Sequence, residues 1–240
     1  MSGVRSHADE DPARSEAQVV HDRLREAILR HEVPADQPVS QVQLAKQLGV
    51  SRTPLREALR LLEREGLVEA RPNRQVRVAP VSPEDLEELY GMRIVLEAFA
   101  CTVTVPQLTP ADLDEIDAAL AEMDRFVEVA DFEAWDEPHR QFHRLLRCHA
   151  GTRIERHLDD LTDHAERYRR LNLTERRAWT QGATEHAGIR DACREGDAAL
   201  ASERLAMHLS KTALTVLAML EPEREPAQVR SALRFSRHVR

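Results

Sequence analysis

The sequence has few cysteines and no long apolar run, which argues against a disulfide-rich protein and against a membrane-spanning one. Among its 240 residues there are three cysteines, Cys101, Cys148 and Cys193, which are far apart and form no CxxC pair. A disulfide framework or a thiolate metal site is therefore not expected, and the simpler interpretation is reduced, partly buried thiols. No apolar run approaches the ~18 residues of a membrane span, and the charged N-terminus does not resemble a signal peptide. We expect a cytoplasmic protein without a membrane partner.

Positive charge is scarce over the chain as a whole but concentrated in one segment. The net charge is −8, yet residues 40–80 contain eight Lys or Arg against four Asp or Glu, whereas residues 81–240 contain 21 against 30. A local basic face on an acidic protein favours binding to phosphates at that face and repulsion elsewhere. The length and the 42% hydrophobic content fit two small domains.

The basic segment begins with the pattern of a helix-turn-helix. Ser40 and Gly49 predict the start and the left-handed end of a short helix, while Ser51 and Gly66 bound a second helix with one apolar stripe. An amphipathic helix precedes them at residues 16–31. Three polar residues remain for solvent at the N-terminal end of the second helix, where a recognition helix reads base edges and phosphates: Arg52, Thr53 and Arg56.

A short hairpin is predicted after the second helix. Residues 67–71 and 76–79 have the pattern of two strands around a turn at residues 72–75, and the hairpin is basic. A basic hairpin in this position is a wing. Residues 15–80 are therefore predicted to form a winged helix-turn-helix domain, which usually places a helix in the major groove of DNA.

The sequence GVSRTPLREALRLLEREGLV, residues 49–68, closely resembles the GntR family of bacterial transcription regulators. The resemblance implies that arginines of the second helix read bases, that its Ser and Thr contact phosphates, and that the tip of the wing enters the minor groove. The residues to which it assigns these contacts are Ser51, Arg52, Thr53, Arg56, Asn73, Arg74 and Gln75.

Two departures from the family pattern affect this interface. Residues 41–43 are Gln-Val-Gln, where family members usually carry a Glu-Arg-Glu-like run whose Arg helps to contact DNA. One DNA contact is therefore expected to be missing. Gln75 stands where the wing turn usually ends in Gly, so the wing tip is expected to differ in shape.

The remainder of the chain is predicted to be helical. Residues 1–14 are polar without periodicity and are expected to be disordered. Residues 83–220 carry helical patterns interrupted by proline and glycine, and residues 221–240 are predicted to be a tail. The expected helices in this domain are 83–105, 110–130, 137–149, 152–172, 176–195 and 198–220.

The segment LEELYGMRIVLE, residues 86–97, resembles the opening of the FCD effector domain of FadR-type GntR regulators. The resemblance extends more loosely over residues 83–220. It implies a helical domain that binds a metal and an effector. The predicted fold class is mainly α, with an N-terminal winged helix-turn-helix and a C-terminal all-helical, FCD-like bundle.

Histidines are the most distinctive residues of the second domain. His139 and His143 lie one helical turn apart, a spacing with which one helix offers two nitrogens to one metal ion. With 11 histidines in the chain, such a pair also arises by chance. Metal-binding FCD domains carry Asp-x-x-Phe-His, then a His before an alanine-rich helix end, then a final His. His143, His186 and His208 fall into those places, and by this resemblance they would bind one divalent ion.

The fourth ligand is where the sequence departs from the family. His139 stands at the position usually taken by Asp. Asp136 is an alternative one turn earlier, although Pro138 suggests that the helix only begins there. His164 is a further candidate, but its charged neighbours favour a solvated face. Four neutral imidazoles would leave the charge of the ion intact and attract an anion, and nitrogen ligands favour zinc, or alternatively nickel or copper, over manganese or magnesium.

Arg93 has two interpretations. It can form an i, i+4 ion pair with Glu97, or it can clamp a carboxylate beside the metal, to which its planar fork is suited. Family resemblance favours the function of a repressor that binds a palindromic DNA operator as a homodimer and responds to a small carboxylate effector held by the metal.

Two alternatives to this function remain. The metal can be purely structural, or the chain can be a metallohydrolase with an attached DNA-binding domain. Arg140 follows His139 where HExxH chemistry requires a Glu, and no other nucleophile and base pair is evident, so we expect no enzyme.

Overall fold

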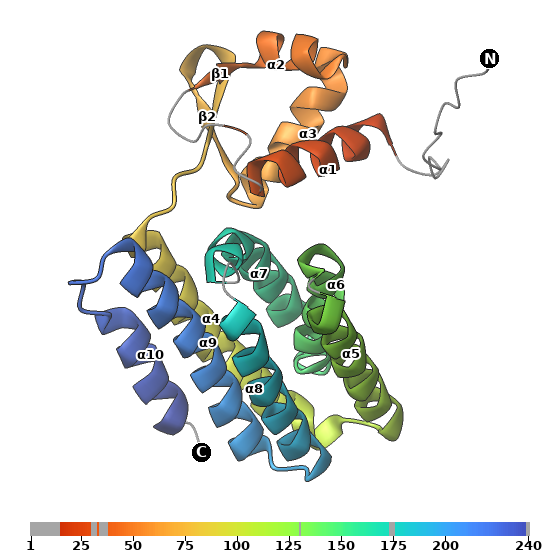
Figure 1. Ribbon diagram of the computed structural model, residues 1–240, viewed down its shortest axis with the longest axis vertical. Helices are drawn as coiled ribbons and strands as arrows, with labels where there is room; N and C mark the ends of the chain where they lie inside the picture. The colour runs from red at the N-terminus through yellow and green to blue at the C-terminus, as the bar shows by residue number, and fades with distance from the viewer. Residues whose placement is uncertain (1–14, 30–32, 34–37, 130, 173–175, 239–240) are drawn as a thin grey trace. The chain divides into compact units, whose positions relative to one another are not determined.

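The computed structural model describes residues 15–29, 33, 38–129, 131–172 and 176–238. The chain divides into two compact units, Met1–Pro80 and Val81–Arg240 (Figure 1). The segment 1–14, expected to be disordered, lies outside the described residues. The structure is mainly α, as the sequence predicted, and its only described strands belong to the first unit.

The first unit combines three helices with a small sheet. The strands pair antiparallel in the order β1-β3-β2, so the predicted hairpin is present and is extended by a two-residue strand that the sequence analysis did not anticipate. Leu55, Ala58 and Leu62 on α3 are fully buried and pack against α1 and the sheet. The elements are α1 (Glu16–Leu29), β1 (Val39–Ser40), α2 (Gln41–Leu48), α3 (Arg52–Arg64), β2 (Val68–Arg71) and β3 (Gln75–Val78).

The predicted helix boundaries in this unit have a visible physical cause. The Ser40 hydroxyl accepts a hydrogen bond from the Val42 N–H at the start of α2, and Gly49 ends this helix with a left-handed φ of 69°. Ser51 occupies the N-cap position of α3, but its side chain makes no capping hydrogen bond. The hydroxyl of Ser51 is exposed and is therefore available for another partner.

The turn of the wing is shaped by Asn73. This residue has φ 62° and ψ 31°, inside a short turn of 3-10 helix that spans Pro72–Arg74. Asn tolerates left-handed backbone better than most residues that carry a Cβ. Gln75 is extended, with φ −96° and ψ 157°, and pairs with Ser40 and Arg71 in the sheet. Position 75 therefore does not require glycine here, because the left-handed residue comes two positions earlier.

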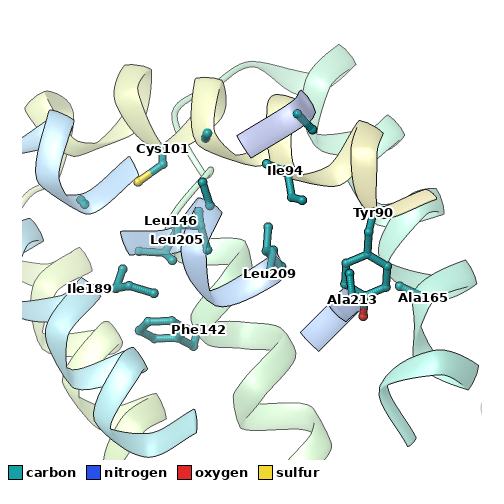
Figure 2. Packing of buried hydrophobic residues seen from close by; sticks show 14 of the residues in the cluster. Tyr90, Ile94, Cys101, Phe142, Leu146, Ala165, Ile189, Leu205, Leu209 and Ala213 are labelled. Carbon is teal, nitrogen blue, oxygen red and sulfur yellow. The ribbon is translucent and has the colours of Figure 1, made fainter. Parts of the chain in front are cut away.

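The second unit is a helical bundle around α4. This helix contacts α7, α9 and α10, and the ribbon shows α9 and α10 beside it (Figure 1). Figure 2 shows the core, where Phe142, Ile189 and Leu205 come together from three different helices. The elements are α4 (Pro83–Thr104), η2 (Val105–Gln107), α5 (Pro110–Val129), α6 (Phe132–Leu145), α7 (Thr152–Asn172), α8 (Arg176–Arg194), α9 (Ala198–Leu220) and α10 (Ala227–His238).

Helix α6 and the tail differ from the prediction. Helix α6 ends at Leu145, whereas the sequence predicted a helix to residue 149. Helix α6 begins at Phe132 rather than near residue 137, because the Asp131 carboxylate caps it by accepting a hydrogen bond from the Ala134 N–H. Pro138 therefore lies inside the helix, where it lacks one N–H but does not end it. The predicted tail contains α10, which packs against α4 and α9 by burying Val229 and Ala232.

Helix α4, with the short turn that follows it, is long and apolar enough by length and composition to cross a membrane. Over half of its most apolar stretch, 56%, is buried inside the protein. Leu86, Ile94, Ala100 and Cys101 are fully buried in the bundle. Its apolar character is therefore that of the central helix of a core.

The start of α4 is tied to α7 by one hydroxyl group. Tyr168 Oη accepts a hydrogen bond from the Ser82 N–H at 3.3 Å and donates to Asp85 Oδ2 at 2.6 Å. Arg167 forms an ion pair with the same Asp85 carboxylate. The first turn of α4 is thus held by two consecutive residues of α7.

Candidate metal and effector site

Four histidine side chains converge inside the second unit. His139 and His143 come from α6, His186 from α8 and His208 from α9. One ring nitrogen from each of them lies within 4.8 Å of the others. All four residues are buried, with exposed fractions of 8% or less. The structure thus brings together the four histidines that the sequence analysis selected, from positions up to 69 residues apart.

The geometry of these rings fits a tetrahedral metal ion. In such a site, zinc–nitrogen bonds of 2.0–2.1 Å separate two ligand nitrogens by about 3.3 Å. His186 Nε2 and His208 Nε2 are 3.2 Å apart. His143 Nε2 is buried without a hydrogen-bond partner among the described residues. Buried ring nitrogens normally have partners, so the donor set fits a divalent ion.

Carboxylates fix the orientation of two of the four rings. Glu97 Oε2 lies 3.3 Å from His143 Nδ1, and Glu185 Oε2 lies 2.8 Å from His208 Nδ1. A carboxylate that accepts the proton of one ring nitrogen leaves the lone pair of the other nitrogen for a metal. Both His143 and His208 would therefore present Nε2 to the centre of the group.

These carboxylates do not neutralise the site, because each is already paired with a cation. Arg93 Nη2 lies 2.7 Å from Glu97 Oε1, and Lys211 Nζ lies 2.6 Å from Glu185 Oε1. Although burial raises the pKa of Glu97, the Arg93 guanidinium and His143 together hold that pKa well below its usual value. Charge supplied by an ion at the histidines would thus remain available to attract an anion.

Three of the four histidines have pKa values that favour the neutral imidazole. Burial lowers the pKa of His139 and of His186 well below the usual value, with further lowering from the neighbouring histidines and from Arg169. Burial lowers the pKa of His143 to about 4, although Glu97 acts in the opposite direction. Neutral imidazole is the form that binds a metal. His139, His143 and His186 are therefore suited to bind an ion at pH 7 without first losing a proton.

Three other residues that the sequence offered for this site, Arg93, Asp136 and His164, lie outside the four-histidine group. Arg93 forms the ion pair with Glu97 and points into the interior, where it is 4% exposed. Asp136 forms an ion pair with Arg169 and is not part of the four-histidine group. His164 is also outside that group.

Sequence reasoning missed Arg169, Trp135 and the two orienting carboxylates. The charged neighbours of His164 were expected on a solvated face, but one of them, Arg169, is 7% exposed, and its Nη1 lies 3.4 Å from His139 Nδ1. The neighbouring Glu166 is fully buried as well. Trp135 stacks on the His139 ring at 4.4 Å between centroids. The position of Trp135, one helical turn before His139, could have predicted their contact. The burial of charged residues in α7 could not have been predicted from the local sequence.

The predicted DNA-contacting residues lie on α3 and in the wing. Ser51, Arg52, Thr53 and Arg56 are exposed at the N-terminal end of α3, and Asn73 is exposed at the tip of the wing. Gln75 is half-buried in β3. The side chain of Arg74 is outside the described part of the structure. The exposed residues of α3 form the continuous polar face that a recognition helix requires.

Comparison with known proteins identifies the class. The family model described as "FCD domain" matches residues 88–211, and that described as "Bacterial regulatory proteins, gntR family" matches residues 16–78. The chain therefore belongs to the GntR family and carries an FCD effector domain. It is a DNA-binding transcription regulator and not an enzyme.

Individual relatives agree with this assignment. An HTH-type transcriptional regulator from an unstable DNA locus of Streptomyces ambofaciens is 31% identical over 189 residues, which cover 78% of this chain and 79% of that protein. A probable D-xylose utilization operon transcriptional repressor of Paenarthrobacter nicotinovorans is 28% identical, over 81% of this chain and 85% of that protein. The structure of Escherichia coli McbR/YncC has a similar fold, with a TM-score of 0.72, 20% identity, and coverage of 87% and 100%.

Proposed function

We propose that this regulator is a cytoplasmic repressor that binds a palindromic operator as a homodimer and is controlled by a small carboxylate held at a divalent metal. The metal ligands would be His139, His143, His186 and His208, and zinc is the preferred ion, with nickel as the alternative. The observation that carries the proposal is the convergence of four buried imidazoles, two of them oriented by carboxylates.

The charge balance at the site supports an anionic effector. The carboxylates nearest to the histidines are already paired, Glu97 with Arg93, Glu185 with Lys211 and Asp136 with Arg169. A bound divalent ion would therefore keep a charge close to +2 in a buried environment, where an oxygen anion is the natural counterpart. Arg93 would favour the effector mainly by neutralising Glu97, because its guanidinium is paired with that carboxylate.

DNA recognition is proposed for the exposed end of α3. Arg52 and Arg56 would read base edges, Ser51 and Thr53 would contact phosphates, and the wing with Asn73, Arg74 and Gln75 would enter the minor groove. Two copies of one reading unit match the two halves of a palindrome, which supports a homodimer. Repression rests on the family and on the relative named as a probable repressor.

Calorimetric titration tests the effector proposal. A panel of small mono- and dicarboxylates is titrated into zinc-loaded and chelator-treated full-length protein. We expect at least one carboxylate to bind only the loaded form and to change operator affinity; linkage then requires the operator to change carboxylate affinity by the same factor. His143→Ala, treated with zinc in the same way, is the matched control and should bind none.

A purely structural metal is the alternative, because it would use the same four histidines. It predicts stoichiometric zinc and a stabilised bundle but no carboxylate that binds in a zinc-dependent manner. Binding that is indifferent to the metal, or no binder in the whole panel, would assign the ion to this structural role.

A further inference from the structure

A second group of potential metal ligands lies in the turn that follows α6. Cys148 and His149 are consecutive in this turn, and Asp112 lies in the first turn of α5. One ligand atom from each of the three residues lies within 4.8 Å of the others. None of them belongs to the four-histidine group. The absence of paired cysteines predicted no thiolate site, whereas the fold brings one cysteine close to two potential ligands of other kinds.

The surrounding backbone holds these side chains in place. The His149 N–H donates to Thr104 Oγ1 at 3.4 Å, which fixes the turn against the end of α4. Asp112 Oδ2 accepts hydrogen bonds from the Thr109 N–H and hydroxyl at 2.8 and 2.7 Å, and it lies 3.2 Å from His149 Nε2. Asp112 and His149, held in this way, lose little conformational freedom when an ion binds.

The charges around Cys148 favour a cation. The acidic groups of Asp112, Glu155 and Glu115 lie close enough to act on the Cys148 thiol, and they attract a positive ion. The His149 and Asp112 side chains are 34% and 22% exposed, so an ion can enter from solvent and keep a water ligand.

We propose that Asp112, Cys148 and His149 form a second, solvent-accessible site for a thiophilic divalent cation such as Zn²⁺ or Cd²⁺. Three protein ligands of mixed type with one open position are typical of exchangeable zinc sites. Binding replaces the S–H bond with a sulfur–metal bond and releases the thiol proton to solvent. The thiolate favours zinc and cadmium over magnesium and calcium, which prefer oxygen ligands.

Cadmium titration separates this site from the four histidines, because only a cysteine ligand produces sulfur-to-cadmium charge-transfer absorption. In full-length, chelator-treated protein we expect this absorption to saturate with one ion and to appear with the release of one proton. Cys148→Ala should abolish the absorption while Cd²⁺ still binds at the histidines. His143→Ala should retain the absorption, and so should Cys193→Ala, the matched control that removes a thiol buried elsewhere.

Two further variants distinguish a built site from a single reactive thiol. Asp112→Asn and His149→Ala should each weaken Cd²⁺ binding at Cys148 at least tenfold, with helical content unchanged by circular dichroism. Absorption that persists in Cys148→Ala, or is absent from the unmodified protein, overturns the proposal. Affinity unchanged in both Asp112→Asn and His149→Ala also overturns it, because the thiol would then bind alone.

Discussion

Histidine has opposite roles in the two units. In the first unit, His21 on α1 lies between carboxylates, with its Nε2 2.5 Å from Glu65 Oε1, and the hydrogen bond to Glu65 raises its pKa despite partial burial. In the second unit, His139 and His143 lie against other histidines, and burial lowers the pKa of each. The same side chain pairs with carboxylates in one unit and packs against other imidazoles in the other.

The two groups of histidines also differ in whether their buried polar atoms are paired. Glu65, at the end of α3, receives both His21 and Arg25 from α1, so the polar groups between these helices satisfy one another. The second unit buries the Nε2 of His143 without a partner among the described residues. Buried polar atoms of this kind cost stability unless a ligand engages them. Stability should therefore depend on a metal in the second unit only.

Removal of His143 should have the largest effect on this contrast. His143→Ala is expected to lose the zinc that the unmodified protein binds stoichiometrically, and with it about 4 kcal/mol of stabilisation at a free zinc concentration of 1,000 times Kd. Elemental analysis and thermal unfolding, with and without a chelator, measure both quantities. His157→Ala, which removes an exposed histidine of α7, should change neither. Equal zinc content in the two variants would contradict the site.

Replacement of Arg52 or Arg56 should affect only the function of the first unit. Each change to Ala is expected to cost about 1–3 kcal/mol in binding to the cognate operator and much less on random DNA, because base readout is lost while phosphate attraction largely remains. Fluorescence anisotropy at fixed salt measures both affinities. Zinc content should stay the same, and equal losses on the two DNAs would exclude a role in base readout.

Glu97→Gln sharpens the comparison within the second unit. Loss of the carboxylate that orients His143 should lower zinc affinity by roughly 10- to 100-fold, as is usual for groups behind a ligand. Competition with a chromophoric chelator gives the affinity. Glu88→Gln, at an exposed position on the same helix, is the control and should be neutral. An affinity that Glu97→Gln leaves intact would mean that packing alone orients the ring.

The smallest expected effect is an opposite response to pH in the metal-free protein. The raised pKa of His21 gives stability that is present below its unfolded value of about 6.5 and is lost as pH rises through the folded pKa. The lowered pKa of His143, about 4, gives stability that is present above the unfolded value and is lost as pH falls.

Hydrogen exchange resolved by helix, and corrected for intrinsic rates, measures this response. Protection of α1 and α3 should fall toward alkaline pH, and protection of α6 and α8 should fall toward acid pH. His21→Gln should flatten the first trend alone. The same trend in both units would contradict the opposite pKa shifts of His21 and His143.

The parts of the fold that the sequence predicts are those with local chemical causes. Ser40 with Gly49 bounds α2, and Ser82 caps α4 by accepting a hydrogen bond from the Asp85 N–H. Pro138 was misleading because a proline can be tolerated inside a helix that an earlier residue, Asp131, has already capped. Helix α10 was missed because its packing on α4 depends on residues more than a hundred positions away.

In the candidate site, too, contacts between residues that are distant in the sequence could not be predicted. Spacing and family resemblance selected the four histidines, whose convergence the structure supports, but the orientation of two rings depends on carboxylates from other helices. Glu97 was named only as a partner for Arg93, and its contact with His143 spans 46 residues. Asp136 was considered as a ligand because of its distance along the helix, yet Arg169 of α7 takes its carboxylate. Neither contact has a signature in the local sequence.

The hydroxyl group of Tyr168 has a mechanical consequence. Its hydrogen bonds hold Ser82 and Asp85, which lie shortly after the end of the first unit at Pro80. The position of Ser82 is therefore fixed relative to α7. The adjacent Arg169 is bound to Asp136, one helical turn from His139. A shift of α7 that rearranges Arg169 would therefore also move Tyr168. Through the hydrogen bonds of Tyr168, it would displace the residues at the start of α4.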